Sequence, residues 1–111
     1  MQASPRTRTA LSAADVRDLR TMLEEQREFR IEQLMHLHGL GSESPLASPD
    51  PEVFRSLDDG ARSALRDVQA ALWRMDEGSY GRCTSCGGDV EVARLEILPQ
   101  TATCLPCARA M

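Results

Sequence analysis

Four cysteines in two pairs limit what this chain can fold into more than any other feature. Cys83 and Cys86 form one CxxC pair, Cys104 and Cys107 form a second, and 17 residues separate the two pairs. This spacing is typical of four-cysteine zinc sites. Each CxxC turns as a knuckle that offers two thiolates, and two knuckles complete a tetrahedron around one Zn²⁺ ion. We therefore predict one zinc ion bound by these four cysteines.

A site made of four thiolates has no open coordination position for water or substrate, so the ion is predicted to be structural. Gly87 and Gly88 follow the first knuckle and permit the turn that points backbone amides at the sulfurs. Oxidation to two disulfides is an alternative state, which leaves a thiol redox sensor as an alternative function. The sequence has no nucleophile with a neighbouring base and no Gly-rich phosphate loop, so we do not expect an enzyme.

Composition favours a small, metal-stabilised protein. The 111 residues include one Trp, one Tyr and two Phe, so a large core is not expected and a metal ion would help to hold the fold. The formal net charge of −4 argues against nucleic-acid binding, which needs clustered basic side chains. No apolar run approaches the ~18 residues of a membrane span, and the start of the chain has no apolar signal region. We expect a cytoplasmic protein.

A long helix is predicted after a disordered tail at residues 1–11. Ser12 and Asp15 have the pattern of a capping box, and no Pro or Gly occurs from there to about His38. The apolar stripe of this helix is irregular, because Gln26 interrupts it, and consists of Val16, Leu19, Leu23, Phe29, Leu34 and Leu37.

A second long helix is predicted after a loop at residues 39–49 that is rich in Gly, Pro and Ser. Asp50 and Pro51 suit the N-cap and N1 positions, and the helix should run to about Glu77, with Gly78 past its end. Its heptad seam is regular and consists of Phe54, Leu57, Ala61, Ala64, Val68, Ala71 and Met75. Two helices of matched length around a short polar loop predict an antiparallel hairpin, with an intermolecular coiled coil as the alternative.

The predicted fold is therefore mainly α: an antiparallel two-helix coiled-coil hairpin at 12–78 and a four-cysteine zinc-finger base at 79–111. Within the base, the alternating residues 89–92 predict a short strand. Trp73 and Tyr80 are expected to cover the junction between hairpin and base. His36 and His38 are expected to complement the dipole at the end of the first helix.

Several motifs in the base resemble the DksA/TraR family of bacterial zinc-finger proteins. They are Gly78-Ser-Tyr-Gly-Arg-Cys83-Thr-Ser-Cys86-Gly, then Arg94-Leu95-Glu96, Pro99 and Cys104-x-x-Cys107. The resemblance implies a monomeric regulator of transcription whose hairpin enters the secondary channel of RNA polymerase. Acidic residues at the hairpin tip then come near the catalytic centre, and the protein does not contact DNA itself. A protein–protein adaptor that does not act on polymerase is the alternative.

The sequence departs from the family pattern at the tip, because it lacks the Asp-x-x-Asp-x-Ala motif there. The tip offers Glu43, Asp50 and Glu52 as candidate partner-binding residues instead, while Asp58 and Asp59 lie further into the second helix.

A second departure concerns the alarmone guanosine tetraphosphate. Responsive members have an arginine where this chain has Leu98, and a basic residue on the second helix near the position of Asp67. Coupling to the alarmone through that site is therefore not expected.

Overall fold

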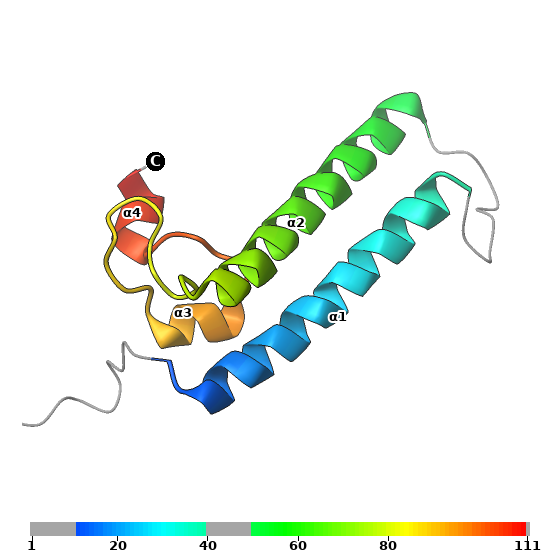
Figure 1. Ribbon diagram of the computed structural model, residues 1–111. Helices are drawn as coiled ribbons and strands as arrows, with labels where there is room; N and C mark the ends of the chain where they lie inside the picture. The colour runs from blue at the N-terminus through cyan, green and yellow to red at the C-terminus, as the bar shows by residue number, and fades with distance from the viewer. Residues whose placement is uncertain (1–10, 40–49, 111) are drawn as a thin grey trace, which may run out of the picture.

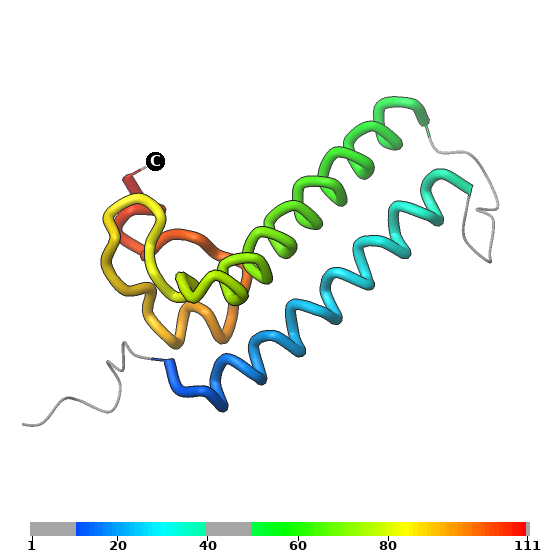
Figure 2. The backbone as a smooth tube through the Cα atoms, in the orientation of Figure 1, coloured from blue at the N-terminus to red at the C-terminus, as the bar shows by residue number. Residues whose placement is uncertain are grey.

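The computed structural model describes residues 11–39 and 50–110. In these ranges the chain forms α1 (Ala13–Leu37), α2 (Pro51–Glu77), α3 (Val92–Ile97) and α4 (Leu105–Ala110), with one isolated bridge between Arg82 and Asp89. Figures 1 and 2 show α1 and α2 running antiparallel as a long hairpin, with α3 and α4 gathered at the end where α1 begins and α2 finishes. The longest axis measures 62 Å. The prediction of a mainly α fold, with a hairpin on a small base, is confirmed.

The ends of α1 form through local hydrogen bonds that the sequence predicts. The backbone N–H of Asp15 donates to the Ser12 hydroxyl at 3.0 Å, and the N–H of Ser12 donates back to the Asp15 carboxylate at 3.0 Å. This reciprocal pair is a capping box, which satisfies amides that have no partner within the helix. At the other end His38 is the C-cap, and Gly39 adopts a positive φ of 71°.

Local hydrogen bonds and a glycine also define the two ends of α2. The Asp50 carboxylate accepts a 2.8 Å hydrogen bond from the N–H of Glu52, and Pro51 occupies the first turn, where its missing N–H has no effect on the helix. Gly78 ends the helix in the left-handed conformation, with φ of 81°. A side chain at this position would strain the backbone, so a glycine stops the helix there.

The hairpin is most apolar next to the base. Leu19 and Leu23 of α1 are buried, as are Val68, Ala71 and Leu72 of α2. Leu23 and Ala71 have no exposed surface at all. Within the described part of α1, Leu19 and Leu23 are the residues that become fully buried, so the hydrophobic stabilisation of the hairpin is concentrated near its base.

In its middle the α1 seam is polar, which corrects the predicted apolar stripe. Steps of three and four from Leu23 reach Gln26, Arg30 and Gln33, and these three side chains are partly buried. Phe29 falls off this seam and is 59% exposed. The heptad geometry therefore outweighs the hydrophobicity of the single phenylalanine.

At the distal end the inward face of α2 shifts by one residue. Leu57, predicted on the seam, is 44% exposed. Phe54 and Asp58, four residues apart on one face, contact the end of α1 instead: the rings of Phe54 and His38 meet edge to face at 5.2 Å, and the Asp58 carboxylate binds His38. A polar contact thus takes the place of an apolar one at this end.

Two predictions for the base are wrong. Residues 89–92 do not form a strand, because α3 begins at Val92 and Asp89 makes only the isolated bridge. Trp73 is 62% exposed and does not cover the junction, although Tyr80 is half-buried there, as predicted.

No helix in the described ranges is long and apolar enough to span a membrane.

Candidate metal centre

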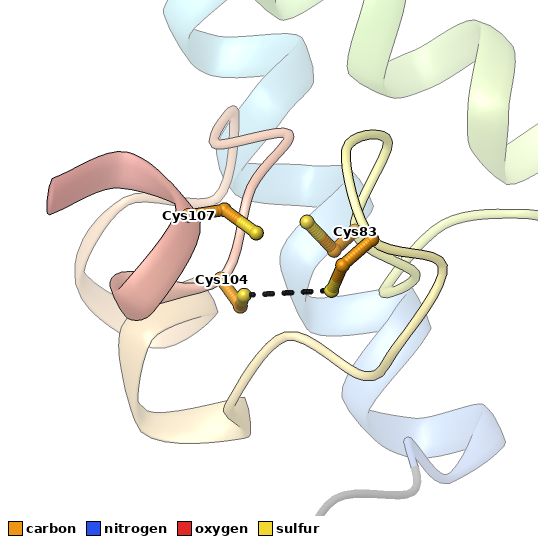
Figure 3. Close-up of side chains that lie close together, drawn as sticks. Cys83, Cys104 and Cys107 are labelled. Atoms are coloured by element: carbon orange, nitrogen blue, oxygen red, sulfur yellow. Dashed lines mark hydrogen bonds between the residues drawn. The ribbon is translucent and has the colours of Figure 1, made fainter. Parts of the chain in front are cut away.

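The four cysteines come together from two separate turns. Cys83 and Cys86 belong to the turn after α2, while Cys104 and Cys107 lie at the start of α4, and Figure 3 shows side chains from both turns facing a common centre. All four sulfurs lie within 4.8 Å of one another. The sulfurs of Cys86 and Cys104 are 3.8 Å apart. Zn–S bonds of ~2.3 Å in a tetrahedron require S···S distances of roughly 3.8 Å, so the cluster fits one zinc ion.

The first knuckle is shaped by its glycines. Gly87 has a φ of 78°, and the N–H of Gly87 donates to the carbonyl of Cys83 at 3.0 Å. This turn brings the N–H of Gly88 to the Cys86 sulfur and the N–H of Ser85 to the Cys83 sulfur, each at 3.4 Å. Amide hydrogens directed at sulfur stabilise the thiolate form that binds metal. The prediction made from the two glycines is confirmed.

The second knuckle is held by the segment that precedes it. The N–H of Thr84 donates to the carbonyl of Ala102 at 2.9 Å, which ties the two knuckles together. The Arg94 guanidinium donates from Nε to the carbonyl of Thr103 at 2.9 Å and from Nη2 to the Thr101 hydroxyl at 3.2 Å. Arg94 therefore fixes the backbone next to Cys104 from its place on α3.

The same segment is also bound to the hairpin. The Tyr80 hydroxyl donates to the carbonyl of Pro99 at 2.8 Å, and the Arg74 guanidinium contacts the carbonyl of Thr101 at 3.4 Å. Arg74 lies in the last turn of α2 and Tyr80 just past its end. The metal centre and the hairpin are thus joined through one short stretch of backbone.

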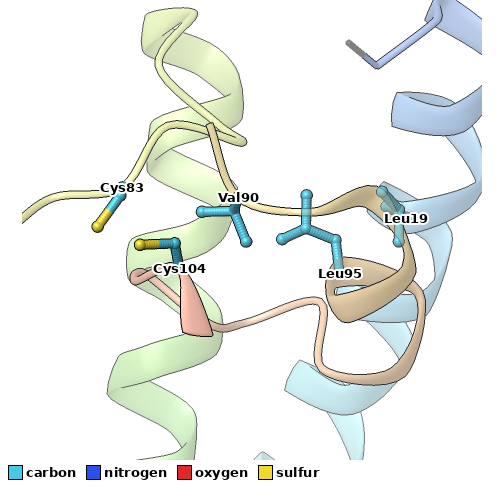
Figure 4. Close-up of a cluster of buried hydrophobic side chains, with 5 residues drawn as sticks. All are labelled: Leu19, Cys83, Val90, Leu95 and Cys104. Atoms are coloured by element: carbon cyan, nitrogen blue, oxygen red, sulfur yellow. The ribbon is translucent and has the colours of Figure 1, made fainter. Parts of the chain in front are cut away.

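An apolar cluster supports the centre from behind. Cys83 and Cys104 are buried together with Val90, Leu95 and Leu19, as Figure 4 shows. Leu19 comes from α1 and Leu95 from α3, so the base packs on the first helix as well as the second. Burial removes water from the sulfurs on this side and leaves the ligands with few alternative positions.

The electrostatics of the cluster call for a cation. Backbone N–H groups, chiefly that of Cys104 and then that of Cys86, lower the pKa of Cys83 to about 6. Hydrogen bonding to the neighbouring sulfurs, chiefly that of Cys104, together with burial raises the pKa of Cys107 to about 12. Zn²⁺ replaces the thiol protons and allows all four thiols to ionise. The four cysteines hold one structural zinc ion.

The predicted tip acids do not gather into a site within the described residues. Asp50 caps α2, and Glu52 is exposed in the first turn of that helix. Glu43 lies outside the described residues. The structure therefore gives Asp50 a structural role at the start of α2.

Sequence reasoning missed a network close to the tip. The Asp58 carboxylate binds His38 Nε2 at 2.8 Å through one oxygen and Arg62 Nε at 3.1 Å through the other. The hydrogen bond from His38, followed by that from Arg62, lowers the pKa of Asp58. Asp58 and Arg62 are one helical turn apart, which the sequence shows, but His38 joins them only through the register of the hairpin.

Comparisons with known proteins agree with the metal centre. Residues 78–111 match the family model described as the prokaryotic dksA/traR C4-type zinc finger. An uncharacterized protein of Aquifex aeolicus is 33% identical over 57 residues, which cover 51% of this chain and 39% of that protein. The RNA polymerase-binding transcription factor DksA of Haemophilus influenzae is 31% identical over 49 residues, 44% of this chain and 34% of its own. The aligned segments thus span little more than a third of these relatives.

Solved structures resemble the whole architecture. Transcription factor DksA2 from Pseudomonas aeruginosa superimposes with a TM-score of 0.64 at 24% identity, over 89% of this chain and 84% of that one. The solution structure of a DnaK suppressor protein from Agrobacterium tumefaciens gives a TM-score of 0.70 at 24% identity, over 94% of this chain and all of that one. At this level of identity the likeness establishes the fold, which is a hairpin on a zinc-finger base.

Proposed function

Because this chain belongs to the DksA/TraR family of C4-type zinc-finger proteins, we propose that it binds RNA polymerase and regulates transcription. In this proposal the hairpin enters the secondary channel of the enzyme and modulates initiation. The zinc-finger base stays outside the channel and holds the hairpin at a defined angle to the enzyme. The protein acts in the cytoplasm as a monomer, without sequence-specific contacts to DNA, in keeping with its formal charge of −4.

The observation that carries the proposal is the exposed apolar surface of the distal hairpin. Met35 on α1 and Val53 and Leu57 on α2 point outward there instead of packing between the helices. An isolated hairpin gains nothing from leaving such side chains in water, whereas a rod that enters a protein channel would bury them. With 25 residues, α1 is about 37 Å long, long enough to reach well into a large enzyme.

The tip is the part that we propose acts near the catalytic centre. Glu43, Asp50 and Glu52 are the candidates, and they would act through charge and hydrogen bonding near the metal ions that polymerase uses. Asp58 is a weaker candidate, because both of its oxygens are bound by His38 and Arg62. No catalytic step is assigned to the protein itself.

The test combines direct binding to purified core RNA polymerase with transcription in vitro. The tip variant carries Glu43→Gln, Asp50→Asn and Glu52→Gln, which remove charge but keep shape. Asparagine also serves as an N-cap, so α2 should begin normally in this variant. We expect the variant to bind polymerase about as well as the unmodified protein while losing most of its effect on transcript yield.

Other outcomes favour the alternatives. If the unmodified protein does not bind core polymerase, the adaptor function takes precedence. If it binds and both forms alter transcription equally, the activity does not depend on the tip acids. A redox sensor requires that mild peroxide release zinc reversibly, which a chromogenic chelator would detect in the same preparation.

A further inference from the structure

The distal half of α2 has an apolar side that the rest of the described chain covers only in part. Val53, Leu57, Gly60 and Ala64 follow one another at steps of four, three and four residues, so they share one side of the helix. Val53 is 49% exposed, Leu57 is 44% exposed, and Gly60 is exposed beside them. We call these four residues the distal face.

The distal face carries no charge. The charged residues of the same stretch of helix lie at least about 100° around the helix axis from it. They are Arg55, Asp58, Asp59 and Arg62. On its outer side the distal face is bordered by two exposed serines, Ser56 and Ser63. A charged partner therefore gains no ion pair on this face, whereas a neutral, apolar partner matches it.

Nothing in the described part of the chain requires a glycine at position 60. Gly60 lies inside α2 and is not among the glycines with a positive φ. A Cβ added there would meet no atom within 4 Å apart from its own turn of the helix. Glycine inside a helix is destabilising, because it loses more backbone freedom on folding than any other residue. Its effect on the distal face is to leave a hole beside Leu57 that can accept a side chain from another molecule.

The order of large and small residues makes the distal face complementary to itself. In an antiparallel pair of α2 helices related by a twofold axis, each contact occurs twice. One register satisfies all four residues, because the pair Leu57 and Gly60 has the same midpoint in the sequence as the pair Val53 and Ala64. In that register Leu57 enters the hole over Gly60 of the second copy, and Val53 packs on Ala64. Such knobs-into-holes contacts bring two helices close together.

We propose that the distal face pairs with the same face of a second copy of this chain, as an antiparallel, twofold-symmetric contact between two α2 helices. From Val53 to Ala64 the contact extends over about 16 Å of each helix. A contact of this length is smaller than the ~1,200 Å² that stable interfaces bury, so the dimer is weak and forms as the protein concentration rises.

The pairing affects the proposed function, and this step rests on that function. Val53 and Leu57 are also side chains that the hairpin would bury on entering polymerase. One face cannot serve two partners at once, so the dimer is the inactive form and the monomer binds the enzyme. Self-association then limits how much active protein is present at high concentration.

Sedimentation velocity of the zinc-loaded protein between about 5 and about 500 µM measures the pairing, and we expect the mean mass to rise from one chain toward two. Gly60→Gln fills the hole with an uncharged, good helix former. It should weaken the dimer at least tenfold while the melting temperature stays the same or rises, since the new side chain meets nothing in the monomer. Ala70→Gln is the matched control, because Ala70 is an exposed small residue of α2 outside the distal face, and it should change pairing less than twofold.

Exchanging the large and the small residue tests the register. Leu57→Ala removes the side chain that enters the hole, and Gly60→Leu fills the hole, so each change alone should weaken the dimer at least tenfold. The double variant Leu57→Ala, Gly60→Leu restores the match in the same register, and its pairing should return to within about threefold of the unmodified protein. A double variant that pairs no better than the single ones would contradict this register.

A protein that stays monomeric over the whole range overturns the proposal, and so does a dimer that persists unchanged in Gly60→Gln. Binding to purified core RNA polymerase separates this inference from the proposed function. A chain that dimerises through the distal face but does not bind polymerase supports the pairing and refutes the proposed function. If the protein binds polymerase, stays monomeric and loses affinity on Gly60→Gln, the distal face belongs to polymerase and the pairing is wrong. Zinc content and the circular dichroism spectrum verify that each variant is folded.

Discussion

The Tyr80 hydroxyl donates a 2.8 Å hydrogen bond to the carbonyl oxygen of Pro99, and this bond joins the end of α2 to the segment that leads into the second knuckle. Tyr80 also packs against both buried clusters, one around the metal centre and one between the helices. A single side chain thus connects the hairpin, the base and the approach to the zinc ligands.

The buried position of Tyr80 makes the free energy of unfolding depend on pH in the alkaline range. Burial raises the pKa of Tyr80 to about 12, and the charge of Arg74 only partly opposes the rise. Because the pKa of an unfolded tyrosine is near 10, the folded state favours the neutral form, and this contribution is fully present below about pH 10 and lost as the pH rises toward 12. Absorbance at 295 nm reports Tyr80 alone, since the chain has one tyrosine. A midpoint near 10 in the folded protein would contradict the prediction.

The matched variant is Tyr80→Phe, which keeps the ring and removes the hydroxyl. We expect a loss of about 1 kcal/mol in the free energy of unfolding at neutral pH, because the hydrogen bond to Pro99 is lost. The variant should also lose the alkaline decrease in stability that the unmodified protein shows. Urea unfolding at pH 8 and pH 11 measures both effects.

Removal of one zinc ligand should disrupt the base. Cys86→Ser leaves three thiolates, and the zinc content should fall well below one ion per chain. Because metal binding in small zinc domains contributes on the order of 10 kcal/mol, we expect the base to unfold at a much lower temperature. The neighbouring variant Ser85→Ala is the control, since only its backbone N–H approaches a sulfur. Equal zinc content and melting in the two variants would refute a structural site.

The register of the hairpin can be tested with two substitutions six residues apart. Leu23 has no exposed surface, so Leu23→Ala should cost about 2–5 kcal/mol in the free energy of unfolding. Phe29 is mostly exposed, and Phe29→Ala should change stability by no more than about 0.5 kcal/mol. Comparable losses would place Phe29 on the seam after all. Thermal and urea unfolding provide the measurement.

The contact between His38 and Asp58 predicts how the pKa of Asp58 changes when His38 is replaced. His38 is the first cause of the lowered pKa of Asp58, so His38→Gln should raise the pKa of that carboxyl toward its ordinary value of 3.8. A carboxyl with a lowered pKa stabilises the folded state above its unfolded pKa and loses this effect as the pH falls below about 4. Carbon NMR of the aspartate carboxyl groups can follow Asp58 in both proteins. An unchanged midpoint would show that Arg62 alone holds the carboxylate.

Local sequence signals were sufficient for the helix ends and the metal site. The capping box at Ser12 and Asp15, the N-cap at Asp50 and the stop at Gly78 each satisfy backbone groups within a few residues, so no distant contact is needed to predict them. The zinc site is also predictable from local sequence, because two CxxC pairs at this spacing have few ways to use four thiolates other than to bind one metal ion.

The sequence could not predict which side chains would face one another across the hairpin. Register decides that Phe29 lies outside the seam, that Asp58 meets His38, and that Leu57 is exposed. The helix at Val92 was missed because alternation over four residues also fits two buried valines of which the first, Val90, packs with Leu95 and the second, Val92, begins a helix. The hollow between α1 and the end of α3 depends even more on tertiary structure, because it brings Phe29 beside Ile97 and Leu98, which lie far from it in the sequence.

The sequence by itself thus determined the two long helices, their ends and the zinc ligands, because those depend on hydrogen bonds and coordination bonds within short segments. Only the tertiary structure decided which surfaces stay exposed. Burial depends on the angle and register at which whole helices pack, and these emerge from many weak contacts summed over distant residues.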